Sequence, residues 1–143
     1  MMMGQYQQAP PLPYTPGMEY SGIVIEKGSD VQRVHLGDRV FVDIFNAGPR
    51  SYGKYQAWGG SATYSAAPES AVRVVPAEFD MHQAATFCGG YETAHHALVH
   101  CANLVEGETV LIHGATGAGG LAATQICSAL GANMIITGGS DEK

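Results

Sequence analysis

The sequence has few charged residues and no run of lysine and arginine. Charged side chains make up 14% of the 143 residues, and the formal net charge is −6 at pH 7. Proteins whose main partner is nucleic acid or an anionic membrane carry basic patches, so the composition argues against both partner classes. No apolar stretch reaches the roughly 18–20 residues that span a bilayer, which argues against a transmembrane protein.

Cysteine is also scarce. Its three copies, Cys88, Cys101 and Cys127, are far apart, and no two of them form a C-x-x-C pair. An odd number without paired spacing supports neither a disulfide framework nor a structural zinc site. Residues 1–17 lack a positively charged stretch followed by an apolar one. We therefore expect no secretory signal there and expect the protein in the cytoplasm.

Glycine, in contrast, is abundant. The 19 glycines gather at turns and in one motif near residue 117, rather than in low-complexity tracts. Glycines placed in this way mark tight turns or a close approach of the backbone to a ligand. The hydrophobic content of 45% is typical of a globular protein, and the length fits one ordinary domain.

The first half of the sequence is predicted to be rich in β-structure. Apolar and polar residues alternate around Ile23–Ile25, a second strand is expected over Val40–Phe45, and residues 61–76 suggest two short strands around a turn at Pro68–Ser70. Several short strands separated by turns favour a small barrel or sandwich.

After Pro76 the pattern becomes helical. Asp80 is placed to cap a first helix over Met81–Phe87, and the pair Gly89–Gly90 is expected to interrupt the helical run. A second helix is predicted over Tyr91–Ala102.

The last third predicts a β-α-β unit. The pattern indicates a strand over Thr109–His113, a helix over Gly119–Leu130 that stops at Gly131, and a strand over Met134–Thr137. Two strands connected through a helix lie parallel in one sheet. The fold class is therefore mixed α/β.

A glycine-rich turn joins that first strand to the helix. Its glycines Gly114, Gly117 and Gly120 are spaced three apart, and the G-x-G-x-x-G register does not fit. Glycine lets the backbone approach a diphosphate, and the helix start adds unpaired N–H groups with a partial positive charge. A glycine turn in some other α/β domain is the alternative. The strand before and the helix after it favour a dinucleotide site.

The end of the second strand bears on the choice between the two nicotinamide cofactors. An NAD site expects an acidic residue there to hold the ribose hydroxyls. Here the strand runs into Thr137–Ser140, and the first acids are Asp141 and Glu142. Ser140 could donate a hydrogen bond to a 2′-phosphate and Lys143 could supply charge, so the sequence favours NADPH. The alternative is that Lys143 is a solvated surface lysine.

These segments together resemble the quinone oxidoreductase (zeta-crystallin-like) branch of the medium-chain dehydrogenases/reductases. The match runs through nearly the whole chain, in the family's order and spacing. The segments that carry it are Leu12–Val24, His35–Phe41, Trp58–Pro68, Gln83–Leu98, Val110–Ile126 and Thr137–Lys143.

The resemblance implies two domains and a reaction. Residues 1–78 would form a GroES-like β-barrel domain that lacks its first strands, and residues 79–143 would form linker helices and the start of a Rossmann domain. The implied reaction is hydride transfer from NADPH to a quinone, an enone or a similarly activated double bond. An enoyl-thioester or alkenal reductase is the alternative, because the loop over residues 46–60 does not decide the substrate.

The resemblance also implies cofactor contacts by position. Thr93 lies where the family contacts the nicotinamide end, Gly117, Ala118 and Gly119 where it contacts the diphosphate, and Gly139 and Lys143 where it contacts the 2′-phosphate. The pair Ala118-Gly119 replaces the family's commoner Gly-Val. We expect this to be tolerated because backbone N–H groups make the contacts.

No metal is expected. Zinc-dependent relatives have Gly-His-Glu where this chain has Gly17-Met18-Glu19, and a thioether is a poor zinc ligand. Glu92, His96 and His100 are spaced four apart and could bind a metal on one helix face, but a solvated helix face is the favoured interpretation. His113 is interpreted as structural.

No catalytic residue is assigned from the sequence. Tyr52, Tyr55 and Tyr64 are candidates for a proton donor, but a structural role is favoured for each. In this branch hydride transfer can proceed largely through positioning, with the cofactor carrying the chemistry.

The resemblance further implies that the 143 residues are a fragment, because a complete nucleotide-binding sheet has about six strands. The parent protein would be a homodimer, and the chain alone is expected to be inactive. A product without catalytic activity that retains a partial nucleotide-binding surface is the alternative class. The edge strand with Met134, Ile135 and Ile136 would then be open to pairing or aggregation.

Overall fold

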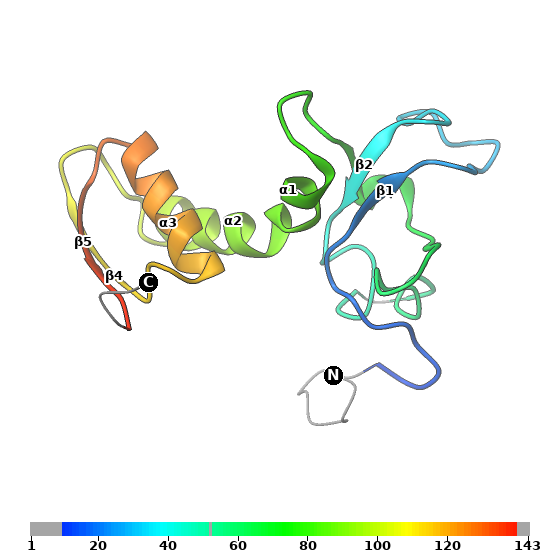
Figure 1. The fold of residues 1–143 in the computed structure, drawn as a ribbon, viewed down its shortest axis with the longest axis horizontal. Helices are drawn as coiled ribbons and strands as arrows, with labels where there is room; N and C mark the ends of the chain where they lie inside the picture. Colours follow the sequence, from blue (N-terminus) through cyan, green and yellow to red (C-terminus); the bar gives the residue numbers. More distant parts are fainter. Residues whose placement is uncertain (1–9, 52, 140–143) are drawn as a thin grey trace. The chain divides into compact units, whose positions relative to one another are not determined.

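The chain divides into two compact units, Met1–Cys88 and Gly89–Lys143. The computed structural model describes residues 10–51 and 53–139. Figure 1 shows short strands in the first unit and a helix-covered pair of strands in the second. This is the mixed α/β fold that the sequence predicts. None of the helices in residues 10–51 and 53–139 is long and apolar enough to cross a membrane.

A three-stranded antiparallel sheet organises the first unit. Its strands are β1 (Ser21–Ile23), β2 (Arg39–Val42) and β3 (Val72–Val74), in the order β1-β2-β3. Val42 faces Val72 across the register. It also belongs to a small buried core with Ala47 and Ala71. The sheet does not close into a barrel within the described residues.

Only one of the two strands predicted over residues 61–76 forms. Residues 61–67 form no strand, and the expected turn is a 3-10 helix, η1 (Glu69–Ala71), that leads into β3. The N–H groups of Gly60 and Ser61 instead donate to the backbone oxygens of Gly17 and Pro16, at 3.0 and 2.8 Å. This pairing is irregular because Gly17 has a φ of +101°, which a regular strand does not allow.

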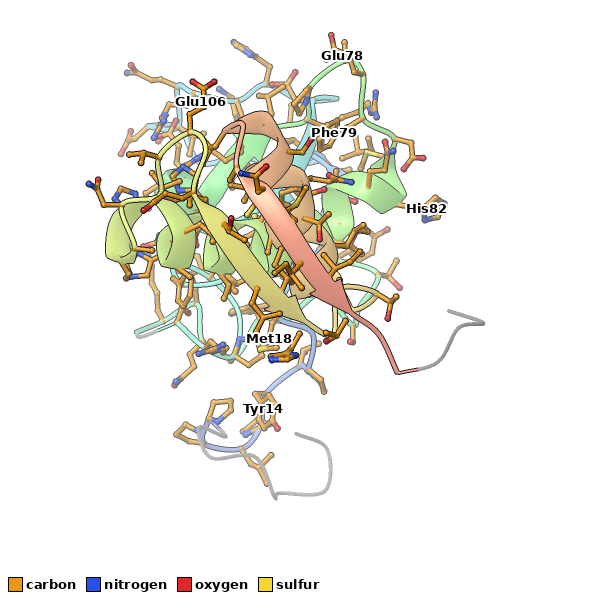
Figure 2. The ribbon with its side chains drawn as sticks, turned by 90° about the vertical axis from the view of Figure 1, so that its left-hand side faces the viewer. Tyr14, Met18, Glu78, Phe79, His82 and Glu106 are labelled. Carbon is orange, nitrogen blue, oxygen red and sulfur yellow. The ribbon has the colours of Figure 1, made fainter. Side chains whose placement is uncertain are left out.

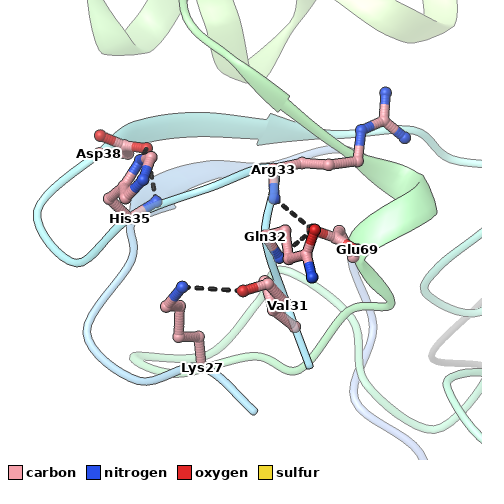
Figure 3. Close-up of polar contacts among 7 residues, drawn as sticks. All are labelled: Lys27, Val31, Gln32, Arg33, His35, Asp38 and Glu69. Carbon is pink, nitrogen blue, oxygen red and sulfur yellow. Dashed lines mark hydrogen bonds and ion pairs between the residues drawn. The ribbon is translucent and has the colours of Figure 1, made fainter. Parts of the chain in front are cut away.

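One carboxylate organises the loop before β2. Glu69 Oε1 accepts hydrogen bonds from the backbone N–H groups of Gln32, at 2.7 Å, and of Arg33 (Figure 3). Lys27 Nζ donates to the carbonyl of Val31 at 2.8 Å in the same loop. The two N–H donors, that of Arg33 first, hold the pKa of Glu69 below its ordinary value.

A capped short helix follows the sheet. α1 (Met81–Ala85) begins after Asp80, whose carboxylate accepts from the N–H of Gln83 at 2.7 Å. The Gln83 side chain accepts in return from the N–H of Asp80 at 3.0 Å, which completes a capping box. The predicted helix start is thereby confirmed. The ring of Phe87 then packs edge-on against Phe79, with centroids 5.4 Å apart.

The prediction that the glycine pair interrupts the helical run is wrong. The break falls at Thr86, where φ −116° and ψ 6° leave the helical region. α2 (Phe87–His95) then runs through Gly89 and Gly90 without interruption. The predicted second helix, Tyr91–Ala102, is in fact the end of α2 followed by a π-helical segment, η2 (His96–Cys101).

The β-α-β unit is confirmed in the second unit. β4 (Thr109–His113) and β5 (Asn133–Thr137) pair in parallel, and α3 (Ala118–Ala129) connects them. Gly131, at a φ of +72°, ends the helix as predicted. Ile112, Cys127 and Ala132 form the buried core between the sheet and the helix, with Leu98, Leu104, Val110, Ala115 and Ala123 packed around them. Burial raises the pKa of the Cys127 thiol.

The face of this sheet turned away from α3 is uncovered in the described chain. Figure 2 looks onto that face, with the helices behind the two strands. Leu111 and Ile135, which pair across the register, are 55% and 57% exposed. All five residues of β5 are exposed, so the expected open edge with Met134, Ile135 and Ile136 is present.

The capping box predicts the effect of a single substitution. Replacing Asp80 with alanine leaves the N–H of Gln83 without its acceptor, and such losses cost about 1 kcal/mol. We expect Asp80→Ala to lower the free energy of unfolding of the first unit by that amount in urea titrations. Glu78→Ala is the matched control, because it removes the same charge two residues earlier at an exposed position. Equal losses in the two variants would contradict the capping role.

The Glu69 contacts predict a pH dependence. A carboxyl group whose pKa is lowered on folding contributes stability above its ordinary pKa of about 4.3, and loses it as the pH falls through the folded value. Glu69→Gln should therefore destabilise the first unit at pH 7, and the difference from the wild type should vanish in acid. Thermal unfolding between pH 3 and 7 measures this. The exposed Glu26, changed to glutamine, is the control and should give no such trend.

Candidate dinucleotide site

The candidate site is the turn between β4 and α3. This connection is tight because the first helical turn of α3 packs directly on the end of β4. A Cβ added to Gly120 would lie 2.3 Å from the Gly114 carbonyl oxygen and 2.7 Å from the Ala115 Cα. Gly114 itself has a φ of +68°, and Gly117 N–H donates to its carbonyl at 3.0 Å. Glycine is therefore required at 114 and 120 for two different reasons, left-handed backbone and close approach.

The start of α3 is open to an anion. Gly117 is the N-cap residue and has no side chain to satisfy the first N–H groups, and the first turn contains no acidic residue. Those N–H groups have no partner within the helix, and the helix end carries a partial positive charge. A Cβ added to Gly119 would meet nothing within 4 Å, so space remains beside them. This uncapped glycine cradle fits a dinucleotide diphosphate.

Thr137 contacts both the last residue of β4 and the turn that follows it. Its carbonyl accepts from Ala115 N–H at 3.1 Å, and its Oγ1 lies 2.9 Å from His113 Nδ1. The carboxyl ends of β4 and β5, which both lead into candidate cofactor loops, are thus held together. The structural interpretation of His113 stays a prediction, but the side-chain contact agrees with it. Sequence reasoning missed the contact because it needs the register of the two strands.

The structure places most predicted cofactor residues in the second unit. The turn brings together Gly114, Gly117, Ala118, Gly119 and Gly120. Thr93 is exposed on α2, and Gly139 is exposed two residues after β5. Ser140 and Lys143, the predicted contacts of the 2′-phosphate, lie outside the described residues.

The alternative metal pattern does not form a site. Across residues 10–51 and 53–139, no group of three or more His, Cys, Asp or Glu side chains could hold a metal ion. The π-helical turn changes the helix face on which the sequence spacing of Glu92, His96 and His100 relied. The ring of His100 instead lies 5.2 Å from that of His95 and 5.7 Å from that of His96, centroid to centroid.

The candidate proton donors lie in the first unit. Tyr64 is 70% exposed, Tyr55 lies under Lys54 Nζ at 5.0 Å from its ring centroid, and Tyr52 lies outside the described residues. Sequence reasoning did not single out Tyr20, whose hydroxyl accepts from Ser65 Oγ at 3.0 Å. Burial raises the pKa of Tyr20. None of these contacts assigns a catalytic role.

Comparison with known proteins identifies the family. Residues 1–77 match the alcohol dehydrogenase GroES-like domain. The chain belongs to that family. The human quinone oxidoreductase is 37% identical over 139 residues, which cover 97% of this chain and 39% of that protein. The chain therefore spans about two fifths of the length of this curated relative.

Solved structures of oxidoreductases also resemble this chain. A mycobacterial protein complexed with NADPH superposes with a TM-score of 0.77 at 30% identity, over 97% of this chain and 39% of that one. The CurK enoyl reductase superposes with a TM-score of 0.74 at 28% identity, over 91% and 35%. The resemblance to medium-chain quinone oxidoreductases is confirmed, which makes this an oxidoreductase family and suggests a nicotinamide cofactor.

The turn geometry predicts different effects on stability at two neighbouring glycines. Gly120→Ala forces a methyl group into the Gly114 carbonyl, and overpacking of this kind costs roughly 1–3 kcal/mol. Gly119→Ala adds the same methyl group in open space and should fold as the wild type does, since alanine favours a helix. Chemical unfolding of both variants measures the difference. Equal stabilities would contradict the close packing of this turn.

Proposed function

We propose that the protein is an NADPH-dependent oxidoreductase that transfers a hydride to a quinone or another activated double bond without zinc. The observation that carries this proposal is the uncapped start of α3, set against the end of β4 by the close contact of Gly120 with Gly114. Such a helix start suits a diphosphate. The mycobacterial neighbour solved with NADPH supports the same cofactor.

The choice of NADPH over NADH rests on the residues directly after β5. The strand ends at Thr137, and Gly138 and Gly139 come next where an NAD site would have an acidic residue. Small residues leave room for a 2′-phosphate. Ser140 and Lys143 would then bind it through a hydroxyl and a positive charge.

The residues of this chain bind and orient, while a bound nicotinamide dinucleotide supplies the hydride. Backbone N–H groups of Ala118 and Gly119 would hold the diphosphate beside Gly117, whose own N–H donates to the Gly114 carbonyl. Thr93 would contact the nicotinamide end. A positioned cofactor accounts for much of such a reaction, because orientation alone lowers the barrier by several kcal/mol.

A second candidate function is reduction of an enoyl thioester or an alkenal. The CurK enoyl reductase among the structural neighbours favours it. A third is a product that binds nucleotide through the α3 turn and does not turn it over. Quinone, enone and enoyl-thioester substrates, tested in parallel for oxidation of NADPH, separate the first two. Because this chain alone is expected to be inactive, binding without oxidation of NADPH supports the third when the parent protein also shows it.

The proposal also includes a domain boundary, an oligomeric state and a cellular location. We infer a domain boundary close to residue 78, because the GroES-like match ends at residue 77. The compact units divide ten residues later, inside α2, between Cys88 and Gly89. That the parent protein is a homodimer and that it is cytoplasmic both stay predictions.

Calorimetric titration with NADPH and NADH tests the proposed cofactor. Hydrogen bonds to charged groups contribute roughly 1.5–3 kcal/mol, so we expect NADPH to bind about tenfold or more tightly than NADH. Lys143→Ala should weaken NADPH binding and leave NADH binding unchanged. Lys54→Ala, a lysine of the first unit over the ring of Tyr55, is the charge-matched control. Equal affinities for the two cofactors would refute the NADPH assignment.

A further inference from the structure

Gly90 occupies an unusual place for a glycine. It lies inside α2 without a positive φ, so its backbone conformation does not require glycine. A glycine in the middle of a helix is destabilising relative to alanine. A Cβ added there would lie 3.2 Å from the carbonyl oxygen of Ala118 and 3.5 Å from its carbon. A side chain at this position would therefore contact the backbone of α3 tightly, and one of the two would have to shift by a few tenths of an ångström.

The atom that Gly90 contacts belongs to the candidate diphosphate cradle. Ala118 is the first residue of α3. Its carbonyl shares one planar peptide unit with the N–H of Gly119, because the peptide bond is rigid. A push on the Ala118 oxygen therefore rotates or shifts the Gly119 N–H. That N–H is one of the groups proposed to hold the diphosphate.

A second contact keeps α2 from moving away. The Tyr91 hydroxyl donates to Gln125 Oε1, two helical turns further along α3. The Ala122 Cβ would also meet an added Gly90 Cβ at 3.8 Å, an ordinary contact distance. The hydrogen bond of Tyr91, the residue after Gly90, thus holds α2 against α3. Because α2 is held there, a side chain added at Gly90 would press on the Ala118 peptide.

We propose that Gly90 is a positioning residue for the diphosphate site, which rests on the proposed NADPH function. Its missing side chain lets α2 lie against the Ala118–Gly119 peptide without displacing it, so that the Gly119 N–H stays available to the diphosphate. The proposal also gives the Gly89–Gly90 pair, which does not interrupt the helix, a physical role. Thr93, three residues along α2, lies on the same side of that helix as Gly90.

The test compares two ligands that differ in the diphosphate. NADPH carries it, whereas adenosine 2′-monophosphate presents only the adenosine and the 2′-phosphate. Gly90→Ala should bind NADPH about tenfold more weakly, as expected from a misplaced hydrogen bond to a charged group. It should bind the monophosphate as the wild type does. His95→Ala, an exposed substitution in the same helix, is the control and should change neither affinity.

A double variant guards against a simple folding defect. Gln125→Ala removes the acceptor of the Tyr91 hydroxyl, so α2 can move away from the added methyl group. Gly90→Ala with Gln125→Ala should therefore recover most of the lost NADPH affinity. A purely structural role of Gly90 predicts that the second substitution makes binding worse.

Each outcome decides between the claims. A wild-type chain that does not bind NADPH overturns the proposed function and this inference with it. A wild type that binds, with a Gly90→Ala variant of equal affinity, overturns the inference alone. Equal weakening of NADPH and of the monophosphate, or no recovery in the double variant, overturns it as well.

Discussion

The contact on which the second unit depends is the approach of Gly120 to the Gly114 carbonyl. No side chain fits between them, since a Cβ at 120 would lie 2.3 Å from that oxygen. The contact places the first turn of α3 on the end of β4, and the rest of the helix then covers the sheet, with its Cys127 in one buried core with Ile112 of β4. The same contact leaves the uncapped helix start exposed. The packing of this unit and the proposed binding of a diphosphate therefore depend on one pair of glycines.

The first unit uses close glycine contacts for a different purpose. A Cβ on Gly59 would lie 2.2 Å from the carbonyl of Thr15, and one on Gly60 would lie 2.5 Å from the Tyr20 Cβ. These contacts bind the loop before residue 61 to the segment before β1 and take the place of a regular strand. Close glycine contacts thus occur in both units, and the turn after β4 combines such a contact with an uncapped helix start.

Prediction from sequence succeeded where local chemistry decides the structure. The predicted bounds of β4 agree with the observed ones, and those of α3 and β5 differ from them by one residue at most. These elements are predictable because glycines mark where the strand pattern and the helix pattern end. The Asp80 cap was found for the same reason. The Gly89–Gly90 break was wrong because tertiary packing on Ala118 overrides the weak helix propensity of glycine. The strand expected within residues 61–67 does not form because Gly60 and Ser61 pair irregularly with Gly17 and Pro16, which no local pattern reveals. The contact between the side chains of His113 and Thr137 likewise depends on the register of β4 and β5, which the sequence does not reveal.

The central claim is that the turn between β4 and α3 binds the diphosphate of a nicotinamide dinucleotide. The most direct measurement is a titration with NADPH followed by the backbone amide resonances of the labelled chain. We expect the largest shifts at Gly117, Ala118 and Gly119, with a second group after Thr137. Unchanged amides at residues 117–119 in a chain that does bind NADPH would contradict the claim.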